Sequence, residues 1–157
     1  MNRYMQEKWS WIEGSLGMRT QLLDSLSDAE LAFTPGGENM TLGALFREMG
    51  EIEHSYLQSL KTFSQDWSYR NTEPGLDGSV ERLKAWFQSL DDALKATVEA
   101  LTDEDLKKSV DRGGYAMPVD WQLDVYLQAL LIFFGKAVVY FKAMGKPLSQ
   151  QFKDYVG

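Results

Sequence analysis

The chain has 157 residues, 44% of them hydrophobic, which is long enough and apolar enough for one folded domain spanning residues 1–157. It has no cysteine, which excludes disulfides, thiolate metal sites and a cysteine nucleophile and favours a cytoplasmic location. The formal net charge is −7 and there is no basic run, so we expect no nucleic-acid binding.

The first long helical pattern runs from about Arg3 to Leu26, with apolar residues recurring every three or four positions. Its first residues are charged and contain no apolar core, so we expect no signal peptide. Gly14 and Gly17 lie within this pattern. Because each glycine costs a helix roughly 1 kcal/mol, we expect the two to permit the close approach of a neighbouring helix.

The second and third helices are marked by their first residues. Thr41 is a good N-cap for a helix that ends near Phe63, and Ser79 begins the next. The connection formed by residues 64–78 is long for a helical bundle. We expect this segment to cross an end of the molecule and to contribute to function.

The fourth helix follows Pro118 and stops before Gly145. The stretch Leu123–Phe141 is apolar on nearly every side, which is typical of a helix at the centre of a bundle or at a subunit contact. Asp124 and Lys136 within it argue against a membrane span. Since one monomer covers only part of such a helix, we expect a homodimer.

Two related turns follow the first and third long helices. Ser27 precedes Glu30 by three residues, and Thr102 precedes Asp105 by three residues, which are capping-box patterns or close to them. Each predicts a short extra helix, and the strand signal is poor throughout. The predicted fold is all-α: a four-helix bundle with short extra helices and one long crossover loop.

Several segments resemble the DinB/YfiT-like superfamily. The run TLGALFREM at residues 41–49 resembles the second-helix motif of that family, which has a Ser/Thr cap, an apolar-Gly-apolar start and then Leu-Leu-x-His. The run GKAVVYFKAMGKP at residues 135–147 resembles the end of its fourth helix, and the paired LSDAEL and LTDEDL turns are also family-like. Together these motifs cover most of the chain, and the resemblance implies a DinB-like four-helix bundle.

The resemblance also implies a divalent metal held by three histidines, one on the second helix and two spaced i, i+4 on the fourth. Position by position, these correspond to Glu48, Ala129 and Phe133, of which only Glu48 is able to ligate. We therefore expect a degenerate metal site and no cofactor; the alternative is a divalent metal at an altered site. Asp124 and Gln128 also offer oxygen donors, but they point about 100–140° away and are expected to be solvated.

Glu53 and Lys136 are charges at positions that should be buried. Glu53 lies in the apolar stripe of the second helix, and a buried carboxylate must be paired, hydrogen-bonded or protonated. Lys136 lies about 20° from Ala129, on the face expected to point to the bundle centre. One hypothesis pairs Lys136 with Glu53 or Glu48. The alternative is that the lysine extends to an end of the bundle and reaches solvent.

The remaining candidates are aromatic or imidazole side chains. Tyr126 and Tyr140 share a broad face of the fourth helix and either line a pocket or are core aromatics. Trp67 is the best candidate to cover a pocket mouth, and His54 is expected to be exposed, with Glu51 as a surface partner. The predicted pocket residues are Glu48, Glu53, Tyr126, Ala129, Phe133, Lys136 and Tyr140.

Two functions are compatible with these patterns. The first is a DinB-like protein without the three-histidine site, acting as a non-catalytic small-molecule-binding or interaction protein. The alternative, which the resemblance implies, is a metal-dependent thiol-conjugate transferase or hydrolase of the family's kind with an altered site at Glu48. The sequence offers no Ser-His-acid arrangement and no phosphate-binding glycine loop. The expected partners are a second copy and a small molecule, with neither nucleic acid nor membrane.

Overall fold

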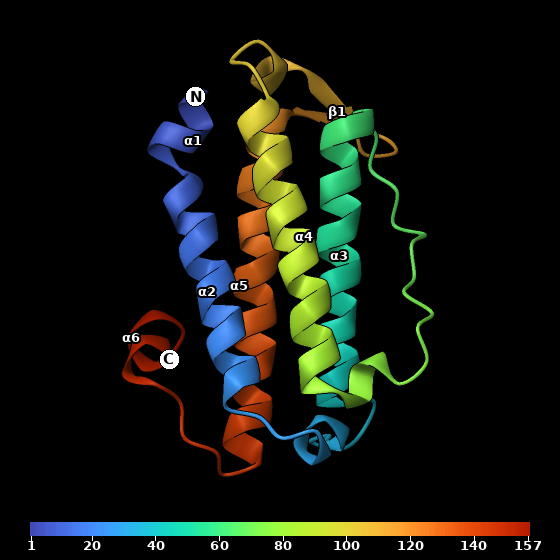
Figure 1. The fold of residues 1–157 in the computed structure, drawn as a ribbon, viewed down its shortest axis with the longest axis vertical. Helices are drawn as coiled ribbons and strands as arrows, with labels where there is room; N and C mark the ends of the chain where they lie inside the picture. The colour runs from blue at the N-terminus through green and yellow to red at the C-terminus, as the bar shows by residue number, and fades with distance from the viewer.

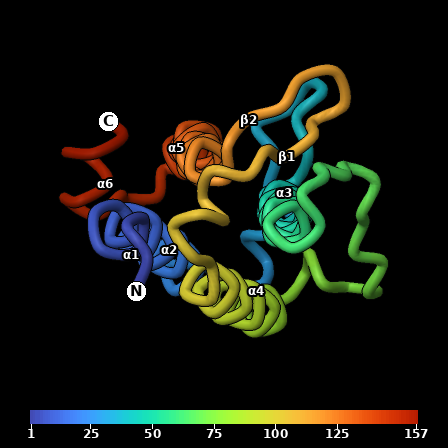
Figure 2. The backbone as a smooth tube through the Cα atoms, turned by 90° about the horizontal axis from the view of Figure 1, so that it is seen from above, coloured from blue at the N-terminus to red at the C-terminus, as the bar shows by residue number.

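The computed structural model describes residues 1–157 and shows four long helices packed as one bundle (Figure 1). These helices are α2 (Trp9–Asp24), α3 (Leu42–Thr62), α4 (Val80–Ala100) and α5 (Val119–Ala143). Seen from above, α5 lies opposite α4 and packs between α2 and α3 (Figure 2). Helices α2 and α5 run in one direction and α3 and α4 in the other (Figure 1). The predicted all-α four-helix bundle is confirmed.

The long helices begin at the predicted caps. The Thr41 side chain accepts a hydrogen bond from the Ala44 amide at 3.2 Å, and the Ser79 side chain accepts one from the Arg82 amide at 3.3 Å. Each cap satisfies an amide that has no partner within its helix. A local sequence signal therefore placed both helix starts correctly.

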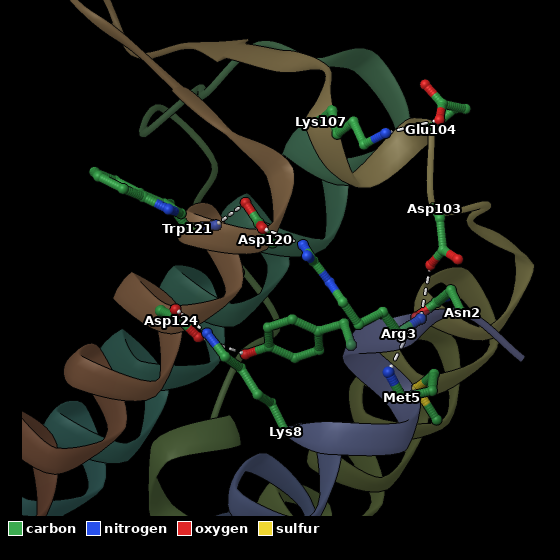
Figure 3. Close-up of polar contacts among 11 residues, drawn as sticks. Asn2, Arg3, Met5, Lys8, Asp103, Glu104, Lys107, Asp120, Trp121 and Asp124 are labelled. Atoms are coloured by element: carbon green, nitrogen blue, oxygen red, sulfur yellow. Dashed lines mark hydrogen bonds and ion pairs between the residues drawn. The ribbon is translucent and has the colours of Figure 1, made fainter.

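The first helix is broken, in contrast to the single helix predicted. Helix α1 (Arg3–Glu7) is separated from α2 by Lys8, whose φ of −127° is not helical. The Lys8 amine binds the Asp124 carboxylate at 2.7 Å, and the Tyr4 hydroxyl donates to the same carboxylate at 3.1 Å (Figure 3). These contacts hold α1 against the beginning of α5, and they join residues far apart in the sequence.

Both capping boxes are present and each begins a 3₁₀ helix. The Ser27 amide donates to Glu30 at 2.9 Å ahead of η1 (Ala29–Ala32), and the Thr102 amide donates to Asp105 at 2.9 Å ahead of η3 (Asp105–Lys107). A third 3₁₀ helix precedes α4. This third 3₁₀ helix is η2 (Leu76–Gly78). The sequence predicted neither the antiparallel hairpin of β1 (Ser109–Asp111) and β2 (Ala116–Pro118) nor the short C-terminal helix α6 (Gln150–Tyr155).

The long connection between α3 and α4 runs along the outer side of α3, and not across an end of the bundle as predicted (Figure 1). Because α3 and α4 run in the same direction, the chain must return the full length of a helix between them. This path places Trp67 and Arg70 beside α3.

The predicted role of Gly14 and Gly17 is wrong. Nothing lies within 4 Å of the position that a Cβ atom would occupy at either residue, and both are exposed. The close approaches are on α3, where Gly43 packs against the backbone carbonyl of Asp77 and Gly50 lies against the ring of Trp86.

Helix α5 is long and apolar enough to cross a membrane by length and composition, yet it is a helix of this bundle. Its side chains toward α2 and α3 form the centre of the core, and 44% of its most apolar stretch is buried. The rest of that stretch is half-buried or exposed.

Candidate functional site: a pocket between α3 and α5

A pocket of about 140 Å³ opens between α3 and α5. Its walls are mostly carbon, because apolar residues of both helices face one another across it. Two charged residues, Glu48 on α3 and Lys136 on α5, complete the lining. The six apolar lining residues are Leu45, Met49, Ile52, Ala129, Ile132 and Phe133.

The structure brings four of the predicted site residues into this pocket. Glu48, Ala129 and Phe133, the three positions that correspond to the histidines of the family resemblance, line it together with Lys136. Glu48 is half-buried, Lys136 is exposed, and neither forms an ion pair within 4.0 Å. The pocket is therefore an apolar hollow that carries one unpaired charge of each sign.

Two further hollows continue the pocket along the same pair of helices. A polar one of about 230 Å³ shares Glu48 and Ile52 with the pocket, and Trp67 of the α3–α4 connection forms part of its wall. A second, of about 260 Å³, shares Leu45 and Lys136. We call the three together the α3–α5 groove. The other lining residues are Glu51, Ser55 and Arg70 in the polar hollow, and Glu38, Asn39, Met40, Val139 and Tyr140 in the second.

Tyr140 is the fifth predicted residue found in the groove. Its hydroxyl donates to the Met40 carbonyl at 2.6 Å, so its polar end has a partner within the protein. Burial raises the pKa of Tyr140, and the charge of Glu48 adds to the rise. The hydroxyl is therefore a neutral hydrogen-bonding group at the end of the groove.

Glu53 and Tyr126 are not in the groove, which corrects the predicted site. Both are fully buried in the core, and the Glu53 carboxylate accepts a hydrogen bond from the Arg19 guanidinium at 2.6 Å. The hypothesis that Lys136 pairs with Glu53 is wrong, because Arg19 of α2 occupies that role. The Lys136 side chain is exposed, as the alternative predicted, but it reaches solvent at the groove and not at an end of the bundle.

The Arg19 guanidinium joins two carboxylates. It binds Glu53 on α3 through Nη1 and Asp91 on α4 through Nη2 at 2.5 Å, and it stacks 3.8 Å from the centre of the Phe87 ring. Burial raises the pKa of Glu53; Arg19 opposes this rise and Asp91 adds to it. Burial also raises the pKa of Tyr126, with the Glu53 charge adding to it.

His54 is half-buried, and not exposed as predicted, because the α3–α4 connection lies over it. The imidazole stacks on the Tyr69 ring with centroids 3.6 Å apart, and burial lowers the pKa of His54. Glu51, its predicted surface partner, instead accepts a hydrogen bond from the Asn71 amide at 3.0 Å. The histidine does not line any hollow of the groove.

The groove does not fit the three-ligand metal site that the resemblance implies. Of the three corresponding positions only Glu48 carries a metal-ligating side chain, and no three His, Asp or Glu side chains in the structure gather in the manner of a metal site. Asp124 is engaged by Lys8 and Tyr4 (Figure 3), and Gln128 is exposed, as the solvated alternative predicted. We therefore derive no chemistry through a metal.

Comparisons with known proteins agree with this fold. A family model described as the DinB superfamily matches residues 13–128. The crystal structure of a DinB-like protein from Bacillus subtilis, YjoA, is similar with a TM-score of 0.68 and 17% sequence identity, over 85% of this chain and 88% of that chain. No curated protein sequence matches the chain. At 17% identity this structural similarity shows a shared fold and nothing more.

Proposed function

The chain belongs to the DinB superfamily, and we propose that it is a non-catalytic member that binds a small amphipathic molecule in the α3–α5 groove. The observation that carries the proposal is the lining of the pocket. Ala129 and Phe133 fill with carbon the positions at which the resemblance implies ligands, while Glu48 and Lys136 remain unpaired at the same place.

The size and lining of the pocket define the apolar part of the ligand. About 140 Å³ bounded by Leu, Met, Ile and Phe side chains suits a short aliphatic chain or a single ring, because such cavities favour apolar occupants over water. Pockets for larger ligands are typically about 300–1,000 Å³. The ligand therefore places only its apolar end here, and its polar end extends into a neighbouring hollow.

The two charges define the polar part. Glu48 lies where the pocket meets the polar hollow, and Lys136 lies where it meets the hollow at Tyr140. Because neither is paired within the protein, binding a polar head breaks no existing ion pair. An amine head suits the Glu48 end and a carboxylate head suits the Lys136 end.

A titration with n-hexylamine, n-hexanoate and n-hexanol tests the proposal, followed by the amide chemical shifts of the labelled protein. We expect at least one of the three to bind with shifts concentrated on α3 and α5. Ala129→Leu fills the pocket and should weaken binding by about tenfold or more, whereas Ala85→Leu, at an exposed alanine of α4, should not. No shifts with any probe, or equal effects of the two variants, would contradict the proposal.

The metal-dependent transferase or hydrolase remains the alternative, because Glu48 and Glu51 both line the polar hollow. It makes a different prediction, namely one equivalent of a divalent metal that is lost in Glu48→Gln. Elemental analysis after supplementation with zinc, manganese and nickel distinguishes the two. A stoichiometric metal that depends on Glu48 would overturn the binding-protein proposal.

A further inference from the structure

The outer face of α5 carries apolar side chains that no part of the chain covers. Trp121 is 64% exposed, Ile132 62% and Val139 56%. The Trp121 ring points away from the contacts that hold α1 against α5 (Figure 3). These residues lie on one helix, so the exposed apolar surface is a stripe that runs the length of the bundle.

The spacing of this stripe is that of a helix–helix seam. Positions 121, 125, 128, 132, 135 and 139 follow one another in alternating steps of four and three residues, and all six are exposed or half-exposed. A repeat of 3.5 residues is what keeps a stripe facing a partner helix. We call these six residues the α5 seam; they are Trp121, Val125, Gln128, Ile132, Gly135 and Val139.

The charges along α5 favour a second copy of the same chain in an antiparallel orientation. No acidic residue occurs from Val125 to Ala143, although the whole chain carries a net charge of −7. The seam is therefore a surface on which two copies meet without opposing carboxylates. Lys142 lies near one end of the helix, so a parallel pair would bring the two Lys142 side chains together, whereas an antiparallel pair keeps them apart.

The shape of the seam is self-complementary in that same orientation. Gly135 leaves open space where a Cβ atom would stand, and Ile132 projects one turn before it. A two-fold axis between these residues makes the two helices antiparallel and sets each Ile132 against the Gly135 of the other copy. The same register places Gln128 opposite Val139, so at these two levels a large side chain meets a smaller one.

We propose that the chain forms a homodimer through antiparallel packing of the α5 seam on the α5 seam of a second copy. The proposal goes beyond ligand binding and does not depend on it, because Gly135 lines no part of the α3–α5 groove. Ile132 belongs to both the seam and the pocket, so the second copy lies beside the pocket wall.

A matched pair of glycine variants tests the interface. Gly135→Glu and Gly17→Glu each place a carboxylate at an exposed helical glycine with open space around it, so neither disturbs the folded monomer. By light scattering at micromolar concentration we expect a dimer for the unchanged chain and for Gly17→Glu, and a monomer for Gly135→Glu. Mixing Gly135→Glu with Gly135→Lys should restore the dimer. A monomeric unchanged chain, or a dimeric Gly135→Glu, overturns the proposal.

The register is tested separately by cross-linking, since the chain has no cysteine of its own. We expect Gln128→Cys and Val139→Cys copies to form a disulfide with each other when they are mixed and oxidised. Each variant alone should cross-link far less. Preferential cross-linking of each variant with itself would show a parallel or shifted pairing and would overturn the antiparallel register.

Discussion

At the scale of single residues, the buried Arg19 is the side chain that most constrains the core. Its guanidinium, which is fully buried, bonds to Glu53 on α3 and Asp91 on α4, so one residue of α2 fixes the positions of two other helices. A buried ion pair adds little net stability over apolar packing, but removing one partner leaves an uncompensated charge. The cluster therefore specifies how the helices align more than it stabilises them.

Substitution of Arg19 measures this constraint. Arg19→Met removes the only cation bound to the buried Glu53 and should lower the free energy of unfolding by about 3–5 kcal/mol. Lys95→Met breaks an exposed pair with Glu13 and should change it by about 0–1 kcal/mol. Urea unfolding followed by circular dichroism provides both values. Equal effects of the two substitutions would show that the buried cluster is no more important than a surface pair.

Glu53 should also make stability depend on pH. Its pKa is raised in the folded state by burial, above the ordinary value of 4.5. The folded protein then holds this proton more tightly than the unfolded chain does, so stability falls as pH rises above 4.5 through the folded pKa. Glu53→Gln carries no such proton and keeps the amide oxygen as an acceptor for Arg19.

We expect the free energy of unfolding of Glu53→Gln to rise relative to that of the unchanged chain as pH increases. Urea unfolding of both proteins at about pH 5 and about pH 8 measures the difference. Glu30 provides the contrast, since its hydrogen bond with Lys146 lowers its pKa below 4.5, so the difference between Glu30→Gln and the unchanged chain should stay nearly constant from about pH 5 to about pH 8. If the free energy of unfolding of Glu53→Gln instead falls relative to that of the unchanged chain as pH increases, Arg19 outweighs burial in setting the pKa of Glu53.

At the scale of the elements, two glycines of α3 set how closely its neighbours approach. A Cβ atom at Gly43 would overlap the backbone carbonyl of Asp77, which has no room to move as a side chain would. Gly43→Ala should therefore lower the free energy of unfolding by about 1–3 kcal/mol through overpacking. Gly14→Ala, at a glycine of α2 with open space, should raise it by about 0.5–1 kcal/mol.

Thermal and urea unfolding of the two variants compare them directly. The opposite signs distinguish packing from helix propensity, because both substitutions make the same chemical change within a helix. If both variants were stabilised, the contact between α3 and the segment at Asp77 would have to relax without cost.

Elements with a local signal were predicted well, and elements held by distant contacts were not. Thr41 and Ser79 cap their helices through amides three residues away, so the sequence contains the whole interaction. The break at Lys8 depends on Asp124, a residue 116 positions away. The β1–β2 hairpin has only three residues in each strand, too few for an alternating pattern to stand out.

The candidate site was predicted in part for the same reason. Ala129 and Phe133 lie four residues apart on one face, and the family resemblance set them opposite Glu48, so their meeting in one pocket followed from helix geometry. The partner of Glu53 did not follow. Arg19 lies at the three-to-four spacing of the apolar residues in α2, which indicates that it is buried. This spacing does not show which neighbouring helix its long side chain contacts.

At the scale of the whole molecule, the groove and the seam lie on adjoining faces of α5. One side of the helix packs with α3 around the pocket, and the outer side carries the seam. Helix α5 is apolar on nearly every side because three different surfaces meet on it: the core, the pocket and the proposed contact with a second copy. This division accounts for the apolar character of a helix that belongs to the bundle.

The proposed dimer should associate more tightly as salt increases from low to physiological concentration. Two copies that each carry a charge of −7, with centres about 30 Å apart, repel by about 2 kcal/mol at about 0.01 M salt and by almost nothing at about 0.15 M. Because added salt removes this repulsion, the dissociation constant should fall by about tenfold. Sedimentation velocity across this range measures it. Weaker association with added salt would mean that ion pairs, and not the apolar seam, hold the two copies together.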